Sequence, residues 1–488
     1  MTSTSPPGWV QDAVFYQIFP DRFASSPRVP KPANLEPWDA PPTVHGYKGG
    51  DLWGIVEHLD YLQDLGVNAL YLNPVFRSAC NHRYHPHDYY QVDPLLGGND
   101  ALKALLDRAH RRGIRVILDG VFNHVGRGFF PFNDILENGA ASPWVDWFTV
   151  HEFPPNAYDP SRPPGYEAWK GLHPLPKLNH ANPQVREYLM KVAEHWIREG
   201  IDGWRLDVPA EIEVEGFWEE FRERVKAVNP EAYLVGEVWR EATEWLRGDR
   251  FDGVMNYRFT EAVIAFVAGD RVRRELVAGR AYRPWPAIDG LTYAERMDRL
   301  LGLYPWAFQL AQYNLLGSHD TARFLSIAGG DEASVRLGVL LLFTFPGAPS
   351  VYYGDEIGME GGHDPDCRRA FPWPRPEAWN RDLLAYHRSL IALRHRHPAL
   401  RSGSYRRVYA DRDTYVFLRR GEDEAILVGV NVAEGNRRVA FPLDLPPHTW
   451  PARLFGRGEL KREGDLVELV LPPRSGGLWG WMRPTEHP

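Results

Sequence analysis

Short apolar runs rich in Val, Ile, Tyr and Phe recur along the chain, and segments with helical spacing of apolar residues separate them. The runs are continuous rather than alternating, which is typical of parallel strands buried on both faces. The runs that we interpret as strands cover residues 14–20, 68–76, 115–122, 203–208, 232–238, 251–257, 313–317 and 349–356. The helical segments with the clearest spacing cover residues 100–112, 183–199 and 217–228, and Gly113 and Gly200 follow the first two.

Eight strands alternating with helices predict an α/β fold, a (β/α)8 TIM barrel. The rival, an open doubly wound sheet, usually has a glycine-rich first turn, which this sequence lacks. A long loop-rich stretch after the third strand predicts an inserted domain B over residues 124–179, and such insertions are usually functional. Alternating strands and turns after residue 400 predict a C-terminal β-sandwich over 401–488, which leaves 1–123 and 180–400 for the barrel.

Composition limits the classes of partner. The 488 residues carry a formal net charge of -8, which argues against nucleic acid. No run is long and apolar enough to span a membrane, and residues 1–9 do not resemble a secretory signal. With only Cys80 and Cys367, disulfides do not hold the fold together, and separate thiols are the commoner outcome in a reducing cytoplasm. We therefore expect a cytoplasmic protein, with a Cys80–Cys367 bridge as the less common alternative.

Polar residues interrupt several of the apolar runs at the end where active sites of such barrels form. Four strands end in a carboxylate. These are Asp119, Asp207, Glu237 and Asp320, and Arg205, His124 and His319 lie at equivalent heights. A single carboxylate at a strand end is more often a helix cap or an ion-pair partner. Burying several charged side chains together costs free energy unless they are paired with one another or serve in catalysis or binding.

The cluster suits glycoside hydrolysis, which needs two carboxylates facing a sugar. The sequence has no P-loop, no HExxH and no G-x-S-x-G elbow. Arg205 beside Asp207 favours an ionised nucleophile, whereas Val235, Val238 and Trp239 around Glu237 suggest a less polar setting for a proton donor. We assign Asp119 to orienting its neighbours.

Four motifs in chain order resemble the signatures of glycoside hydrolase family 13, the α-amylase family. They are Asp119-Gly-Val-Phe-Asn-His124, Gly203-Trp-Arg-Leu-Asp207, Gly236-Glu-Val-Trp239 and Gly317-Ser-His-Asp320. By this resemblance Asp207 is the nucleophile, Glu237 the acid/base and Asp320 the third carboxylate, and the reaction retains anomeric configuration. The resemblance also implies that His124, His319 and Arg205 hold the sugar and that Tyr84 stacks beneath it.

A narrower resemblance is to the neopullulanase, cyclomaltodextrinase and maltogenic amylase group. It is carried by Leu175-Pro-Lys-Leu-Asn179 and by the stretch from Gly354 to Arg369. It implies that Asp364 and Arg368 bind sugar on the non-reducing side, and that Trp169 and Trp239 lie on the leaving side, although ordinary core packing explains these two Trp residues equally well.

The sequence departs from this group in several places. The first strand starts near residue 14, so we do not expect the group's N-terminal β domain, and dimerisation and a preference for cyclodextrins are in doubt. Ser25-Ser-Pro-Arg28 offers poor oxygen ligands where relatives bind calcium, so we predict no metal ligands and no required cofactor, with calcium at Asn123 left open. His85 stands where relatives often have Asp.

We therefore expect a retaining hydrolase of α-1,4-glucosidic bonds in maltodextrins, cyclodextrins, pullulan or starch, with transglycosylation, acting as a monomer or weak homodimer. A glucosyl transferase or isomerase of the trehalose-forming type, built on the same carboxylates, is an alternative. A non-catalytic sugar-binding barrel fits less well, because such relatives usually lose catalytic carboxylates and this chain keeps all three.

Overall fold

Eight parallel strands form a closed barrel at the centre of the computed structural model, which describes residues 4–279, 281–444 and 451–482. The strands run in the order β8-β7-β6-β5-β2-β1-β10-β9, and a parallel bridge between Met255 and Tyr313 joins the two ends. The sequence prediction of a (β/α)8 barrel is confirmed. The barrel strands are β1 (Phe15–Ile18), β2 (Ala69–Leu72), β5 (Arg115–Gly120), β6 (Gly203–Leu206), β7 (Tyr233–Gly236), β8 (Gly253–Val254), β9 (Tyr313–Asn314) and β10 (Ala348–Tyr352).

The strands are shorter than the apolar runs that predicted them. The run 68–76 was predicted as one strand, but β2 ends at Leu72, and β3 (Phe76–Ser78) pairs antiparallel with β4 (Pro86–Val92). Pro74 lies between β2 and β3 and has no N–H group to donate to a sheet hydrogen bond. Likewise, β8 stops at Val254 because the Asn256 side chain caps the next helix by accepting a hydrogen bond from the Phe259 N–H.

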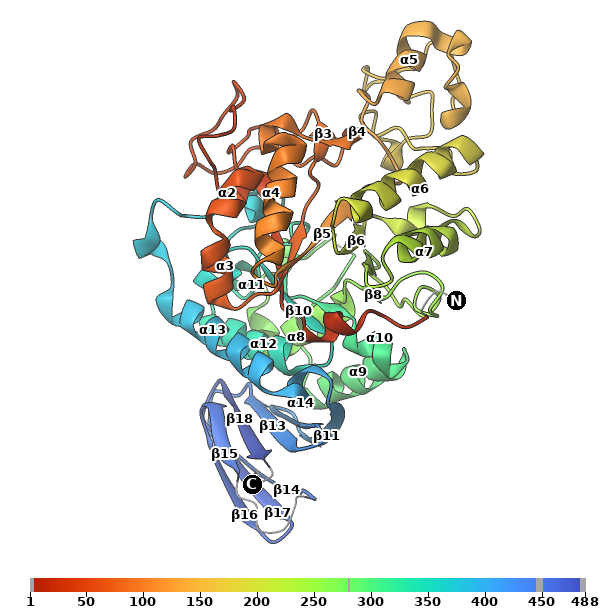
Figure 1. The fold of residues 1–488 in the computed structure, drawn as a ribbon. Helices are drawn as coiled ribbons and strands as arrows, with labels where there is room; N and C mark the ends of the chain where they lie inside the picture. The colour runs from red at the N-terminus through yellow and green to blue at the C-terminus, as the bar shows by residue number, and fades with distance from the viewer. Residues whose placement is uncertain (1–3, 280, 445–450, 483–488) are drawn as a thin grey trace.

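Helices surround the barrel (Figure 1). The predicted helix 183–199 is α6 (Pro183–Arg198), which begins with Pro183 and has the Asn182 side chain as its cap. It ends where Gly200 takes a positive φ of 108°. The remaining helices outside the insertion are α1 (Pro20–Phe23), α2 (Leu52–Glu57), α3 (Leu59–Leu65), α4 (Gly98–His110), α7 (Phe217–Val228), α8 (Tyr257–Val267), α9 (Gly290–Gly302), α10 (Trp306–Leu310), α11 (Phe324–Ile327), α12 (Glu332–Thr344), α13 (Arg381–Arg396) and α14 (Pro398–Arg401).

The segment between β5 and α6 projects from one end of the barrel (Figure 1). It contains α5 (Phe130–Asn138) and is otherwise held by isolated bridges, such as those of His124 with Lys177 and of Phe148 with Leu178. Phe132 packs edge-on against Phe148 at a centroid distance of 5.0 Å, so the segment has an apolar centre of its own. The predicted bounds 124–179 stay a prediction.

Two antiparallel sheets form the C-terminal part, at the opposite end of the molecule in Figure 1. Its first two strands form a hairpin, because the Asp411 side chain accepts hydrogen bonds from the backbone N–H groups of Asp413 and Thr414 and turns the chain. The first sheet contains β11 (Ser404–Ala410), β12 (Thr414–Arg420), β13 (Glu424–Asn431), β18 (Ser475–Met482) and β15 (Ala452–Gly456); the second contains β14 (Arg437–Pro442), β17 (Leu466–Leu471) and β16 (Glu459–Glu463).

The structure tests the predictions about the two cysteines and about membrane-spanning segments. Both cysteines are free thiols, so the alternative of a Cys80–Cys367 bridge is wrong. Within the described ranges, no helix has the length and apolar character needed to cross a membrane. The outermost residues of the predicted domains, 1–3 and 483–488, and the stretch 445–450 lie outside the described residues.

Candidate active site

The strand-end carboxylates meet at one end of the barrel because its strands are parallel. Asp119 is the second-to-last residue of β5, Asp207 directly follows β6, and Glu237 directly follows β7. These three strands are neighbours in the sheet. Asp320 comes from the loop beyond β9 and is the most exposed of the four, with 31% of its side chain accessible.

A single buried guanidinium holds three of these carboxylates. Arg205 Nη1 lies 2.8 Å from both Asp119 Oδ1 and Asp207 Oδ1. Its Nη2 atom lies 3.0 Å from Glu237 Oε2. Three carboxyl groups around one permanent cation leave an excess of negative charge in a buried place, so ionising all three at once is unfavourable.

The pKa of the Asp207 carboxyl group is raised well above its ordinary value. Burial is the main cause; the Arg205 guanidinium lowers this pKa, whereas the negative charges of Glu237 and Asp119 raise it further. The sequence suggested only the effect of Arg205. Burial and the two neighbouring carboxylates come from other strands, and local sequence does not reveal them.

Glu237 has a more polar setting than its sequence neighbours suggested. Its Oε2 atom accepts a hydrogen bond of 3.0 Å from the Val208 N–H, and its Oε1 atom accepts one of 2.8 Å from Trp239 Nε1. Val208 adopts a φ of 35°, which is strained for a β-branched residue. This strain lies directly after Asp207 and aims the Val208 N–H at the second carboxylate, as is common at active sites.

Tyr84 and His319 form a polar chain beside the carboxylates. Tyr84 Oη donates to Asp119 Oδ2 at 2.7 Å and lies 2.6 Å from His319 Nε2. Gln17 Nε2 lies 2.8 Å from His319 Nδ1, and an amide N–H is only a donor, so the proton of the neutral ring is on Nε2. Burial lowers the pKa of His319 well below its usual value, which fits this neutral tautomer.

Aromatic rings line the space beyond the carboxylates. Trp169, on a short 3-10 turn of the insertion, stacks on His124 at 5.2 Å. Trp239 lies flat on Tyr257 at 3.5 Å, with 6° between the rings. Burial lowers the pKa of His124 to about 3, so this imidazole is neutral at physiological pH.

Asp364 and Arg368 approach from the loop after β10. Arg368 Nη1 lies 3.1 Å from Asp364, and its Nη2 lies 3.6 Å from Asp320 Oδ1. Arg368 Nε also donates to the His319 carbonyl at 2.9 Å, which fixes the guanidinium next to the third carboxylate.

A cavity of about 520 Å³ joins these groups, which is the size range of a ligand site. Arg205 and Asp119 do not line it and lie beneath it, so the structure places Arg205 against the carboxylates rather than against the cavity. The sequence-predicted residues that do line it are Asp207, Glu237, Asp320, Tyr84, His124, His319, Trp169, Trp239, Asp364 and Arg368.

Sequence reasoning missed several residues that shape the site. Gln17 is the only polar residue in the run 14–20, and this interruption was a usable signal. Tyr71 donates to Asp119 at 2.6 Å, and Tyr257 supports Trp239, but both look like core aromatics in sequence. Sequence reasoning also missed that Cys80, His82 and His85 come together on the β3–β4 hairpin.

Comparison with known proteins identifies close relatives. A family model described as "Alpha amylase, catalytic domain" matches residues 17–380. A cyclomaltodextrinase from Geobacillus thermopakistaniensis is 43% identical over 96% of this chain and 76% of its own length. The structure of a debranching enzyme from Nostoc punctiforme is 54% identical with a TM-score of 0.90, over 98% of this chain and 99% of its own. The ligand-free cyclic α-maltosyl-(1→6)-maltose hydrolase from Arthrobacter globiformis is 40% identical with a TM-score of 0.87, over 98% and 100% respectively.

Proposed function

The chain belongs to the α-amylase family of glycoside hydrolases, and from this premise we propose that it hydrolyses α-1,4-glucosidic bonds in maltodextrins and related α-glucans with retention of configuration. The observation that carries the proposal is the Arg205 contact shared by Asp207 and Glu237 at the floor of an aromatic-lined cavity. One group can then attack while the other handles the proton, as retaining glycosidases require.

In the first step, Asp207 attacks the anomeric carbon and Glu237 donates its proton to the departing oxygen, which gives a covalent glycosyl intermediate. In the second step, Glu237 removes a proton from water, and the resulting hydroxide displaces Asp207. The Val208 N–H and Trp239 Nε1 hold both oxygens of Glu237 through this exchange. Asp320, paired with Arg368, is placed to bind hydroxyl groups of the distorted sugar.

The rest of the cavity supplies sugar contacts in this proposal. Tyr84 and the His319 and His124 imidazoles surround the ring at the cleavage point, and Arg205 acts from beneath by positioning the carboxylates. Trp169 and Trp239 offer flat apolar surfaces to the leaving sugars, and Asp364 and Arg368 bind on the non-reducing side. Two of the similar solved proteins are named for debranching and for an α-(1→6)-linked ring, so α-1,6 bonds are the substrate feature to test next.

We also propose that the reaction needs no metal. Side chains supply the nucleophile, the proton donor and the charge stabilisation. Near Ser25–Arg28, where the family resemblance implies a calcium loop, cationic side chains already neutralise the neighbouring carboxylates, because Arg28 lies 3.5 Å from Glu57 and Lys31 2.6 Å from Asp51. After β5, Asn123 Oδ1 is buried without a hydrogen-bond partner among the described residues, so a cation could still use this acceptor. Activity that survives EDTA supports the proposal, and loss restored by Ca²⁺ contradicts it.

The test of function compares the wild type with Asp207→Asn on β-cyclodextrin, pullulan, soluble starch and maltotriose. We expect wild-type hydrolysis of maltodextrins with α-anomeric products by NMR, and a variant that is inactive but folded, with an unchanged circular dichroism spectrum. Rearranged products without net hydrolysis would support the transferase or isomerase instead. Wild-type inactivity on all four substrates would overturn the proposal. The cytoplasmic location stays a prediction, which cell fractionation tests. The monomeric or weakly dimeric state also stays a prediction, and light scattering tests it.

A further inference from the structure

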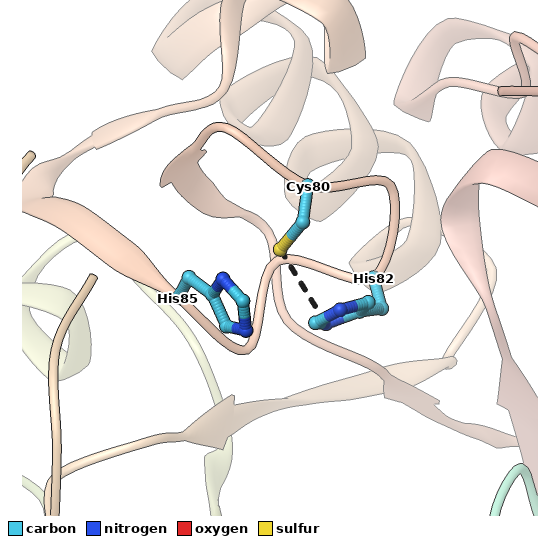
Figure 2. Close-up of side chains that lie close together, drawn as sticks. All are labelled: Cys80, His82 and His85. Atoms are coloured by element: carbon cyan, nitrogen blue, oxygen red, sulfur yellow. Dashed lines mark hydrogen bonds between the residues drawn. The ribbon is translucent and has the colours of Figure 1, made fainter. Parts of the chain in front are cut away.

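Three metal-ligating side chains converge on the hairpin loop between β3 and β4. Cys80, His82 and His85 each offer one ligand atom, and these atoms all lie within 4.8 Å of one another. Figure 2 shows the Cys80 sulfur and the two imidazole rings pointing toward a common space. All three side chains are half-buried. No step of the proposed hydrolysis uses this group.

We propose that Cys80, His82 and His85 form a binding site for a thiolate-preferring divalent cation such as Zn²⁺, and that the bound ion excludes saccharide from the adjoining cavity. One thiolate and two imidazoles are a ligand set that zinc favours, with a fourth position left for water. The 3.4 Å between Cys80 Sγ and His82 Nδ1 suits two ligands of one tetrahedral ion with bonds of about 2.3 and 2.1 Å.

The hairpin holds these ligands in place before any ion arrives. Ser78 Oγ donates to the His85 carbonyl at 2.7 Å, which ties the end of β3 to the last residue of the loop. Asn81 Nδ2 donates to the carbonyls of Val44 and Gly46, and buried Arg83 pairs with Asp93 at 2.8 Å. Little conformational entropy is therefore lost when the ion binds.

Cysteine and histidine bind a divalent cation in different protonation states. A neutral imidazole offers the lone pair of one ring nitrogen, whereas cysteine binds as its thiolate. Binding then replaces one proton. The Cys80 S–H bond breaks, the proton leaves to solvent, and the thiolate donates its electron pair to the cation, without any change of oxidation state.

The position of the site links it to the sugar cavity. His82 and His85 line that cavity together with the carboxylates, and Tyr84 lies between them in sequence and reaches Asp119. A cation with its bound water at this rim occupies space and holds the Tyr84 backbone in place. The exclusion of saccharide rests on the proposed function, whereas the binding of the cation does not.

Calorimetric titration of the purified chain with Zn²⁺, after EDTA treatment and dialysis, tests the site, and Co²⁺ gives a spectroscopic signature through thiolate-to-cobalt charge-transfer absorption. We expect one ion per chain and a charge-transfer band. Loss of an outer-shell partner alone weakens metal sites about 10–100-fold, so Cys80→Ser and His85→Gln should each weaken binding by at least about 100-fold, and Cys80→Ser should abolish the band. Cys367→Ser, the matched control at the other thiol, should keep both.

Absence of a stoichiometric Zn²⁺ isotherm in the wild type, or equal affinity in folded Cys80→Ser, overturns the site. Exclusion is measured by titrating maltotriose into Asp207→Asn with and without Zn²⁺. We expect the ion to weaken maltotriose binding at least about tenfold. Equal affinity with and without the ion overturns the exclusion. If maltotriose does not bind even without Zn²⁺, the proposed function and the exclusion fail, whereas the Co²⁺ band still decides the metal site.

Discussion

Glu356 gives the sharpest prediction about stability, because it is a carboxyl group in the apolar interior. It follows β10 and is fully buried. Its Oε1 atom accepts hydrogen bonds from Tyr16 at 2.7 Å and Tyr61 at 2.6 Å, whereas Oε2 is buried with no partner among the described residues. Burial raises the pKa of this carboxyl group from 4.5 to about 7, although both tyrosines lower it.

The sign of the pH dependence follows from this raised pKa. In the unfolded chain Glu356 releases its proton near pH 4.5, whereas in the folded protein it keeps the proton until about pH 7. Between these values the folded state binds more protons, so its stability falls as pH rises through this window. At about 1.4 kcal/mol per pH unit, ionisation costs the folded state about 3 kcal/mol above pH 7.

We therefore expect Glu356→Gln, which mimics the protonated form, to match the wild type at pH 4.5 and to be more stable at pH 8. An unfolding entropy of about 2.1 cal/mol/K per residue gives about 1 kcal/mol/K for 488 residues, so Tm should rise by about 3 °C at pH 8. Calorimetric scans of both proteins at one scan rate measure this difference.

Tyr61→Phe is the matched control, because it removes one of the two hydroxyl groups that favour ionised Glu356 and keeps the ring. It should therefore raise the folded-state pKa of Glu356 further, so the loss of stability still begins near pH 4.5 but extends to higher pH. A Tm difference between Glu356→Gln and the wild type that is the same at pH 4.5 and pH 8 would refute the reasoning, since the substitution would then act through packing alone.

Three further predictions concern the site and the barrel end. Because Asp119 raises the pKa of Asp207, Asp119→Asn should move the acidic limb of the kcat/KM profile, where activity is lost as Asp207 gains a proton, to lower pH. Trp239→Phe keeps an aromatic ring but loses the indole N–H that donates to Glu237 at 2.8 Å, so kcat/KM on maltotriose should fall about tenfold or more. Unchanged kinetics would show that this hydrogen bond does not orient Glu237 for catalysis. Arg323→Met leaves Asp355, whose carboxylate lies 2.6 Å from Arg323, without its ion-pair partner. It should lower the free energy of unfolding by about 3–5 kcal/mol, measured as a lower Tm that Arg323→Lys partly restores.

Much of the fold could be predicted because its signals are local. Buried parallel strands appear in the sequence as continuous apolar runs. Helix termini also have local signals, such as Gly113 after a C-terminus and Asn182 with Pro183 at an N-terminus. Strand lengths were overestimated, since an apolar run continues through residues that leave the sheet, as at Pro74. Side-chain turns also end strands inside apolar stretches, as at Asp411, where the turn outweighs the strand propensity around it.

The sequence by itself determined the barrel and the set of strand-end side chains, because parallel strands place their ends on one face whatever their exact pairing. Only the tertiary structure decided which of these groups touch. The sharing of Arg205 by three carboxylates depends on the register of β5, β6 and β7. The convergence of Cys80, His82 and His85 depends on the conformation of one hairpin loop. Periodicity fixes the face to which a side chain belongs, whereas contacts of a few ångströms require the relative positions of segments far apart in the chain, which burial and packing set together.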